Sequence, residues 1–108
     1  GHIDYGTNSA LGDFAIHFIN NFHADICFMS CRGLDRFGSY EANYNQALLK
    51  QQMIANSDLT VLLADSSKFH TSHYFKLANY NVIDYIITNE APVDSFQDTV
   101  SKQCEILW

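Results

Sequence analysis

Two lysines in the middle of the chain, Lys50 and Lys68, have the side chains best suited to hold a ligand. An ammonium group is a mobile point charge with three donors, which suits a phosphate or a polyhydroxylated anion. Lys68 closely follows an apolar run, and beside it Asp65 can orient the ammonium group while Ser67 adds a hydroxyl donor. The same residues can instead form a turn in which Asp65 and the serines cap backbone groups and Lys68 points into solvent. The residue types alone favour neither interpretation.

A polar stripe precedes this segment. Asn43, Gln46 and Lys50 recur at i, i+3 and i+7 and therefore share one face of a helix. Asn43 is a good N-cap, and strong helix formers follow it, so we predict a helix from Asn43 to about Ala55. Its polar face is either part of a ligand site or a solvated surface.

The elements that must position these side chains alternate between strands and helices. Apolar runs predict strands buried on both faces, and three- to four-residue spacing predicts amphipathic helices. The predicted strands are Ile26–Ser30, Thr60–Ala64, Ile83–Thr88 and a short one at Tyr74–Leu77; the other helices are Ser9–Phe22 and one that closes the chain, with Pro92 in its first turn and Phe96, Val100 and Cys104 on one face. This order predicts an α/β domain, three-layered, with a mostly parallel sheet flanked by helices. Ligands of such sheets bind beyond the carboxyl ends of the strands, which the polar segments 32–43 and 65–72, predicted as loops, both follow.

Composition narrows the class of protein. A chain of 108 residues with 47% hydrophobic and 17% charged residues is a single globular domain. Its net charge of −6 argues against direct DNA binding. Three cysteines outside a disulfide framework favour a reduced, cytoplasmic setting. The histidines lack the spacing of metal ligands. No run is long and apolar enough to span a membrane.

Two longer segments resemble the hallmark segments of the sensor domains of DeoR-type bacterial transcriptional regulators: GSYEANYNQALLKQQMI at 38–54 and LLADSSKF at 62–69. In that family a glycine and an asparagine precede an acidic pair, an alanine and a lysine, and a D-x-S-K-F loop follows the next strand. FMSCRGLD at 28–35 and IDYIITN at 83–89 resemble the family's preceding strand with its glycine turn and its last core strand. Asn45 and Gln46 stand where the family has its acidic pair.

The resemblance implies a fold shared with ribose-5-phosphate isomerase and glucosamine-6-phosphate deaminase (the CoA-transferase-like type), used to sense a phosphorylated sugar and release a repressor from its operator. It implies an effector site without metal or cofactor, formed by Lys68, Lys50, Asn43, Gln46, Asp65, Ser67, Ser30, Arg32 and Gly33. The family's DNA-binding winged helix-turn-helix and its glycine- and threonine-rich phosphate loop are expected upstream of this single sensor domain. A homo-oligomer is expected.

Two alternatives remain. The first is a sugar-phosphate isomerase or deaminase of the same fold, which needs a carboxylate base. No Asp or Glu occurs from Ala42 to Ser57, and Ser30 and Gly33 stand where the isomerase-like register expects acids, so Asp35 and Glu41 are the remaining candidates and we predict no enzyme. The second is a domain that serves oligomerisation alone, suggested by aromatic side chains of the kind favoured at interfaces. These are Tyr40, Tyr44, Tyr74, Phe75 and Tyr80.

Overall fold

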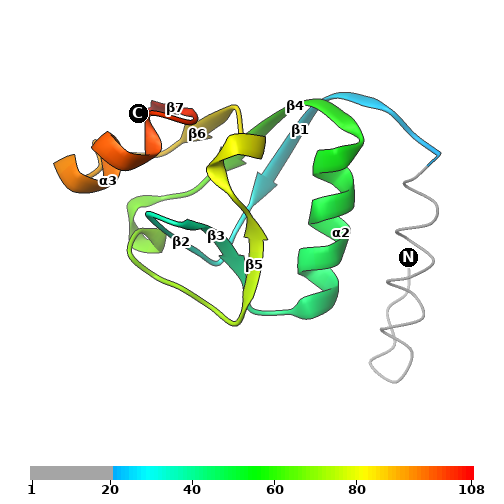
Figure 1. The fold of residues 1–108 in the computed structure, drawn as a ribbon, viewed down its shortest axis with the longest axis horizontal. Helices are drawn as coiled ribbons and strands as arrows, with labels where there is room; N and C mark the ends of the chain where they lie inside the picture. Colours follow the sequence, from blue (N-terminus) through cyan, green and yellow to red (C-terminus); the bar gives the residue numbers. More distant parts are fainter. Residues whose placement is uncertain (1–20) are drawn as a thin grey trace.

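The computed structural model describes residues 21–108, so nearly all of the helix predicted at Ser9–Phe22 lies outside the described part of the chain. Seven strands are combined with two α-helices and two 3-10 turns in this part (Figure 1). In chain order the elements are β1 (Ala24–Ser30), β2 (Gly33–Asp35), β3 (Gly38–Glu41), α2 (Tyr44–Ala55), β4 (Ser57–Leu63), the 3-10 turn η2 (Ser66–Lys68), β5 (Phe75–Ala78), the 3-10 turn η3 (Tyr80–Val82), β6 (Tyr85–Ile87), α3 (Asp94–Val100) and β7 (Glu105–Leu107).

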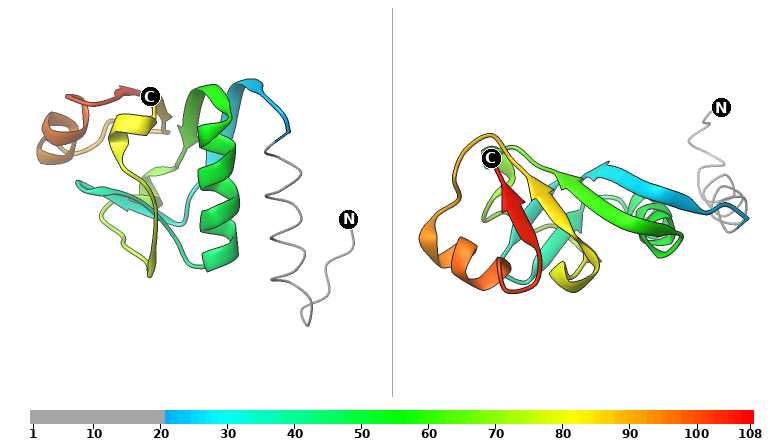
Figure 2. Two further views of the ribbon diagram at one scale, coloured as in Figure 1. Left: turned by 45° about the vertical axis from the view of Figure 1, so that its right-hand side comes forward. Right: turned by 90° about the horizontal axis from the view of Figure 1, so that it is seen from above.

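Four strands form a parallel sheet, which we call sheet A. Its order is β1-β4-β6-β7, and the strands lie side by side in Figure 2. Ala24 pairs with Ser57, Val61 with Tyr85, and Tyr85 with Glu105. The three apolar runs predicted as strands correspond to β1, β4 and β6, whereas β7 was not predicted. A mostly parallel sheet with flanking helices confirms the predicted α/β class.

The hydrophobic core lies on one face of sheet A. Leu62 of β4 and Ile86 of β6 are fully buried, and they belong to one cluster with Phe96 and Val100 of α3. Burial of side chains of this size stabilises the fold by about 1.5–3 kcal/mol each. Cys104, predicted to share a face with these α3 residues, is also buried, although α3 ends before it.

The opposite face of sheet A is apolar and largely exposed. The prediction that the strands are buried on both faces is therefore wrong for β1 and holds only at the centre of β4, where Thr60, Val61 and Leu62 are all buried. Phe28 is 60% exposed, and β1 is the terminal strand of the sheet, covered on this side by none of the described elements. On this outer face Val61, which pairs with Phe28, is buried, whereas five other apolar residues are exposed. They are Ile26, Leu59, Leu63, Ile87 and Leu107.

A second, antiparallel sheet of three strands, sheet B, corrects the prediction that residues 32–43 form a loop. Its order is β2-β3-β5, and it lies between α2 and α3 (Figure 1). The turn of the β2–β3 hairpin is held by Asp35, whose Oδ1 accepts hydrogen bonds from the backbone N–H groups of Phe37 (2.8 Å) and Gly38 (3.2 Å). Asp at the first position of a turn and Gly at the fourth is a known turn signature, so Asp35 and Gly38 were the signal for this hairpin.

Both helices among residues 21–108 begin close to where they were predicted. Asn43 caps α2: its Oδ1 accepts a hydrogen bond from the backbone N–H of Gln46 (3.1 Å), as predicted. Pro92 lies just before Val93, the N-cap of α3, rather than in the first turn of the helix. Neither helix is long and apolar enough to cross a membrane.

Candidate functional site

A pocket of about 330 Å³ opens where β1 ends. Its walls come from the end of β1, the end of β3 and the first two turns of α2, so it lies beyond the carboxyl end of a parallel strand, where ligands of α/β sheets bind. We call it the β1-end pocket. Its lining residues are Ser30, Cys31, Arg32, Glu41, Ala42, Asn43, Gln46 and Lys50.

The pocket unites several of the residues predicted to form the effector site, namely Ser30, Arg32, Asn43, Gln46 and Lys50. The i, i+3, i+7 spacing thus correctly placed Asn43, Gln46 and Lys50 on one side of α2, facing the pocket. Lys68, Asp65, Ser67 and Gly33 do not line it.

Glu41 and Lys50 form an ion pair that sequence reasoning did not identify. Nζ of Lys50 lies 3.4 Å from Oε2 of Glu41, and both side chains are largely buried, with 17% and 6% of their surface exposed. The same ammonium group donates a hydrogen bond of 2.7 Å to the backbone carbonyl of Ser30. Lys50 is therefore already partnered, and its charge is largely compensated within the protein.

Lys68 lies close enough to the pocket to act on its wall electrostatically. The Cys31 thiol forms part of that wall, and burial, reinforced by the Glu41 carboxylate, raises its pKa to about 11. The ammonium groups of Lys50 and Lys68 both act in the opposite direction on this pKa. A backbone bridge between Leu34 and Phe69 places the segment that carries Lys68 beside β2, although Lys68 itself does not line the pocket.

Asp65 and Ser67 make the contacts of a capped turn. Oδ1 of Asp65 accepts hydrogen bonds from the hydroxyl group of Ser67 and from its backbone N–H (2.9 Å). These bonds, with a smaller contribution from Lys68, lower the pKa of Asp65. The backbone N–H of Ser66 donates to Oδ1 of Asn89 (2.7 Å), which fastens η2 to the end of β6. The turn thus fixes the position of the backbone that carries Lys68.

Gly33 serves close packing. A Cβ atom at this position would lie 2.3 Å from the backbone carbonyl oxygen of Thr71, whose N–H donates to the carbonyl of Leu34 (3.2 Å). A side chain at residue 33 would therefore push the segment after η2 away from β2. Gly33 supports the site by bringing the Lys68 segment next to the hairpin.

The two acids proposed as bases of an enzyme differ in their surroundings. Oδ1 of Asp35 is engaged in the hairpin turn and also accepts a hydrogen bond from the Tyr40 hydroxyl (3.2 Å). Glu41 is the acid that lines the β1-end pocket.

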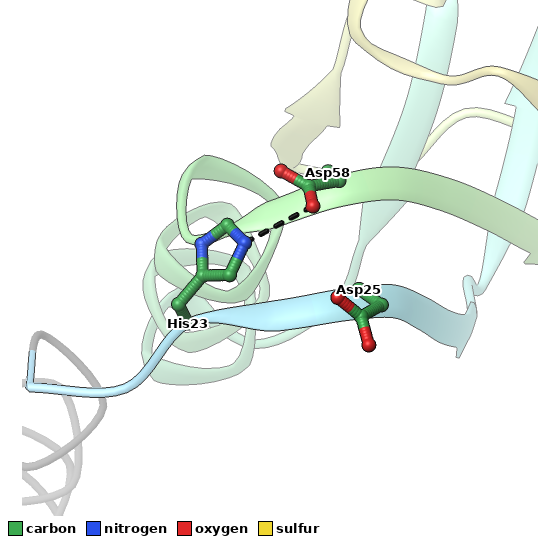
Figure 3. Close-up of side chains that lie close together, drawn as sticks. All are labelled: His23, Asp25 and Asp58. Carbon is green, nitrogen blue, oxygen red and sulfur yellow. Dashed lines mark hydrogen bonds and ion pairs between the residues drawn. The ribbon is translucent and has the colours of Figure 1, made fainter.

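A second group of chemically capable side chains lies at the opposite ends of the strands. His23 precedes β1, Asp25 lies in β1 and Asp58 in β4, with Nε2 of His23 3.1 Å from Oδ2 of Asp58 (Figure 3). One ligand atom from each of the three lies within 4.8 Å of the others, a proximity that sequence spacing did not predict. All three side chains are exposed, and an exposed ion pair contributes only about 0–1 kcal/mol, so we assign the group no part in the site.

Larger hollows lie elsewhere on the described surface. One of about 410 Å³ is bordered by the segment between α3 and β7, and one of about 400 Å³ lies between the β2–β3 turn and α3. Neither includes Lys50 or Lys68. The β1-end pocket remains the candidate site because it combines position in the sheet with the polar face of α2.

Comparison with known proteins identifies the family. Residues 1–90 match the model of the DeoR C-terminal sensor domain. The chain is 37% identical over 99 residues to an uncharacterized HTH-type transcriptional regulator, YulB, of Bacillus subtilis, covering 87% of this chain and 38% of that protein. It is 29% identical over 109 residues to a putative aga operon transcriptional repressor of Escherichia coli O157:H7, covering 99% of this chain and 40% of that protein. It is 28% identical over 83 residues to the glycerol-3-phosphate regulon repressor of Escherichia coli K12, covering 76% of this chain and 33% of that protein.

The chain thus spans less than half the length of these relatives, which are transcriptional regulators. The family model covers most of the chain, and the parallel α/β sheet agrees with it. This chain belongs to the DeoR C-terminal sensor domain family.

Proposed function

We propose that this chain is the effector-binding domain of a bacterial transcriptional repressor of sugar metabolism. A phosphorylated sugar bound in the β1-end pocket modulates DNA binding by a helix-turn-helix domain elsewhere in the protein. The observation that carries the proposal is the β1-end pocket, which Arg32 and Lys50 line and beside which the segment that carries Lys68 is held against β2. The name of one relative, a glycerol-3-phosphate regulon repressor, supports a phosphorylated ligand, and this name and that of a putative aga operon transcriptional repressor support the regulatory role.

Within this proposal the cationic residues have separate tasks. Arg32 is exposed at the pocket and Lys68 is half-buried, and neither forms an ion pair within residues 21–108. They are therefore the proposed partners of the phosphate, since a charge that is not already neutralised attracts an anion more strongly. The Asn43 and Gln46 side chains on the polar face of α2 are the proposed contacts of the sugar.

The test is the thermal stability of the intact protein with a panel of pentose and hexose phosphates and the matching free sugars. A sugar phosphate at 100 times its Kd should stabilise the protein by about 2.7 kcal/mol. Lys68→Ala should abolish this shift, whereas Lys102→Ala, which removes an exposed lysine outside the β1-end pocket, should retain it. Equal shifts for wild type and Lys68→Ala, or equal shifts with the free sugars, would reject the proposal.

A second candidate is a sugar-phosphate isomerase or deaminase of the same fold. One observation favours it: Glu41, an acid able to serve as a base, lines the pocket beside Lys50. Turnover of a sugar phosphate that disappears in Glu41→Gln would support this candidate. Absence of turnover of every sugar phosphate in the same panel would reject it.

We also propose that the protein acts in the cytoplasm as a homo-oligomer. All three cysteines are free thiols, as a reducing compartment requires. The exposed apolar outer face of sheet A supports self-association, since contiguous apolar surface of this kind marks interaction sites. Tyr80, one of the aromatic residues first considered for such an interface, is only 1% exposed and belongs to the core.

A further inference from the structure

Glu41 carries a buried acceptor that the protein leaves without a hydrogen bond. The residue is 5% exposed, and its Oε2 atom has no hydrogen-bond partner among residues 21–108. Lys50 is 3.4 Å away but directs a hydrogen bond at the carbonyl of Ser30 instead. A buried carboxylate oxygen without a donor costs free energy, and such a group requires an explanation. The Oε2 atom itself is shielded from solvent, so a donor in the β1-end pocket, which Glu41 lines, contacts it only after a side-chain shift.

The charges at this end of the pocket determine which donor fits. Glu41 and Lys50 carry opposite charges and compensate each other, so this end attracts no second anion. A cationic donor is disfavoured by the ammonium group of Lys50 only 3.4 Å from the oxygen. An uncharged donor such as a hydroxyl group meets neither obstacle.

We infer that Oε2 of Glu41 accepts a hydrogen bond from a hydroxyl group of the sugar effector. The site then has two parts: Arg32, with Lys68 from the neighbouring segment, binds the phosphate, and the Glu41–Lys50 pair recognises the sugar hydroxyls. An ammonium group has three donors, so Lys50 can still donate to an oxygen of the sugar while it contacts Glu41 and Ser30. Glu41 is thus a specificity-determining residue, and this role rests on the proposed function.

The predicted selectivity follows from the strength of such bonds. Hydrogen bonds to charged groups are worth enough that loss of one should weaken binding about 10- to 100-fold. A deoxy analogue that lacks the contacted hydroxyl leaves the buried oxygen unpaired, so the wild-type protein should discriminate against it by that factor.

The experiment is titration calorimetry on the intact protein and its Glu41→Gln variant. The probes are inorganic phosphate, the sugar phosphate of the panel that binds best, and its series of monodeoxy analogues. Glu41→Gln should lose the about 10- to 100-fold discrimination against one analogue. It should bind inorganic phosphate at least as tightly as wild type, because the Lys50 charge is no longer compensated. Glu90→Gln, which changes an exposed carboxylate outside the pocket, should behave as wild type.

Loss of the discrimination together with unchanged or tighter phosphate binding separates a binding role of Glu41 from a structural one. A disrupted pocket would weaken the binding of both phosphate and sugar. If Glu41→Gln unfolds, the double variant Glu41→Gln with Lys50→Met removes both charges together, which buried pairs tolerate better than loss of one partner. It should keep phosphate binding and lose the hydroxyl discrimination. Discrimination that persists in a folded variant overturns the inference and leaves the proposed function intact. Absence of binding of any probe to wild type, or binding that Lys68→Ala does not affect, overturns the proposed function and the inference with it.

Discussion

Lys50 illustrates how a side chain with a recognisable position in the sequence acquires its chemistry from a partner in the fold. Its place on the polar face of α2 followed from the i, i+3, i+7 spacing with Asn43 and Gln46, and the structure places all three along the pocket. Its pairing with Glu41 did not follow, because Glu41 lies in a strand and its side chain reaches Lys50 only after β3 and α2 have packed together. The sequence therefore indicated where the charge lies but not that it is compensated.

At this scale the buried thiols give a prediction about pH. Burial raises the pKa of Cys31 and of Cys104 from an ordinary value of 9.0 to about 11. Between pH 9 and pH 11 the folded chain keeps these two protons and the unfolded chain loses them, so the unfolded chain binds fewer protons. Stability should therefore fall as the pH rises through this window.

The measurement is the urea midpoint of unfolding at pH 8, 9, 10 and 11. The double variant Cys31→Ala with Cys104→Ala should show a shallower decline above pH 9, although its midpoint at pH 8 will be lower because buried volume is lost. In the folded wild type the thiols should also react slowly with a disulfide reagent at pH 8, since the thiolate is the reactive form. A decline equally steep in both proteins would show that other groups cause it.

Among the elements, the β2–β3 hairpin is the one on which the site depends most. Arg32, directly before β2, and Glu41, at the end of β3, both line the pocket. The hairpin is held by Tyr80, whose single hydroxyl proton is shared between the backbone carbonyls of Asp35 (2.5 Å) and Gly38 (3.2 Å). Burial, together with the nearby Asp35 carboxylate, raises the pKa of Tyr80, so the hydroxyl keeps the proton that it donates.

Tyr80→Phe should destabilise the protein by about 1–3 kcal/mol, because two partly buried carbonyl groups lose their donor while the ring volume is retained. The measurement is the free energy of unfolding in urea. Tyr74→Phe is the matched control, since this side chain is 92% exposed, and its effect should stay within about 0.5 kcal/mol. A change of similar size in both variants would contradict the role given to Tyr80.

The predictability of the elements follows their length and apolar content. β1 and β4 have seven residues each and continuous apolar runs, and the apolar segment that contains β6 was also identified. β2, β3 and β7 have three or four residues, too few for an alternating pattern to stand out, and β2–β3 was hidden by its two glycines. The capping residue Asn43 fixed the start of α2 because its signal is local.

On the scale of the whole molecule, the uncovered outer face of sheet A is the main departure from the prediction. A continuous apolar run predicts burial of both faces of a strand, but it does not say which segment covers each face. Within residues 21–108, Phe28 and its neighbours on that face are exposed. The proposed homo-oligomer would bury them.

Phe28→Lys should therefore shift the intact protein from an oligomer to a monomer, as measured by light scattering with size-exclusion chromatography. Phe37→Lys is a matched control, because Phe37 is also 60% exposed but lies in the β2–β3 turn away from the outer face. An oligomer unaffected by Phe28→Lys would show that self-association uses another surface. A monomeric wild type would reject the oligomer itself.

The parallel register of sheet A also affects the order in which parts of the chain fold. Ala24 of β1 pairs with Ser57, 33 residues further along, and Val61 pairs with Tyr85, 24 residues further along. In the β2–β3 hairpin, by contrast, Asp35 pairs with Gly38 across a tight turn. Hairpins form within about 1–10 µs, whereas pairings between distant residues must first close long loops. The hairpin that carries Arg32 and Glu41 can thus form early, but their pocket is completed only in the slower step that joins β1 to β4 and docks α2.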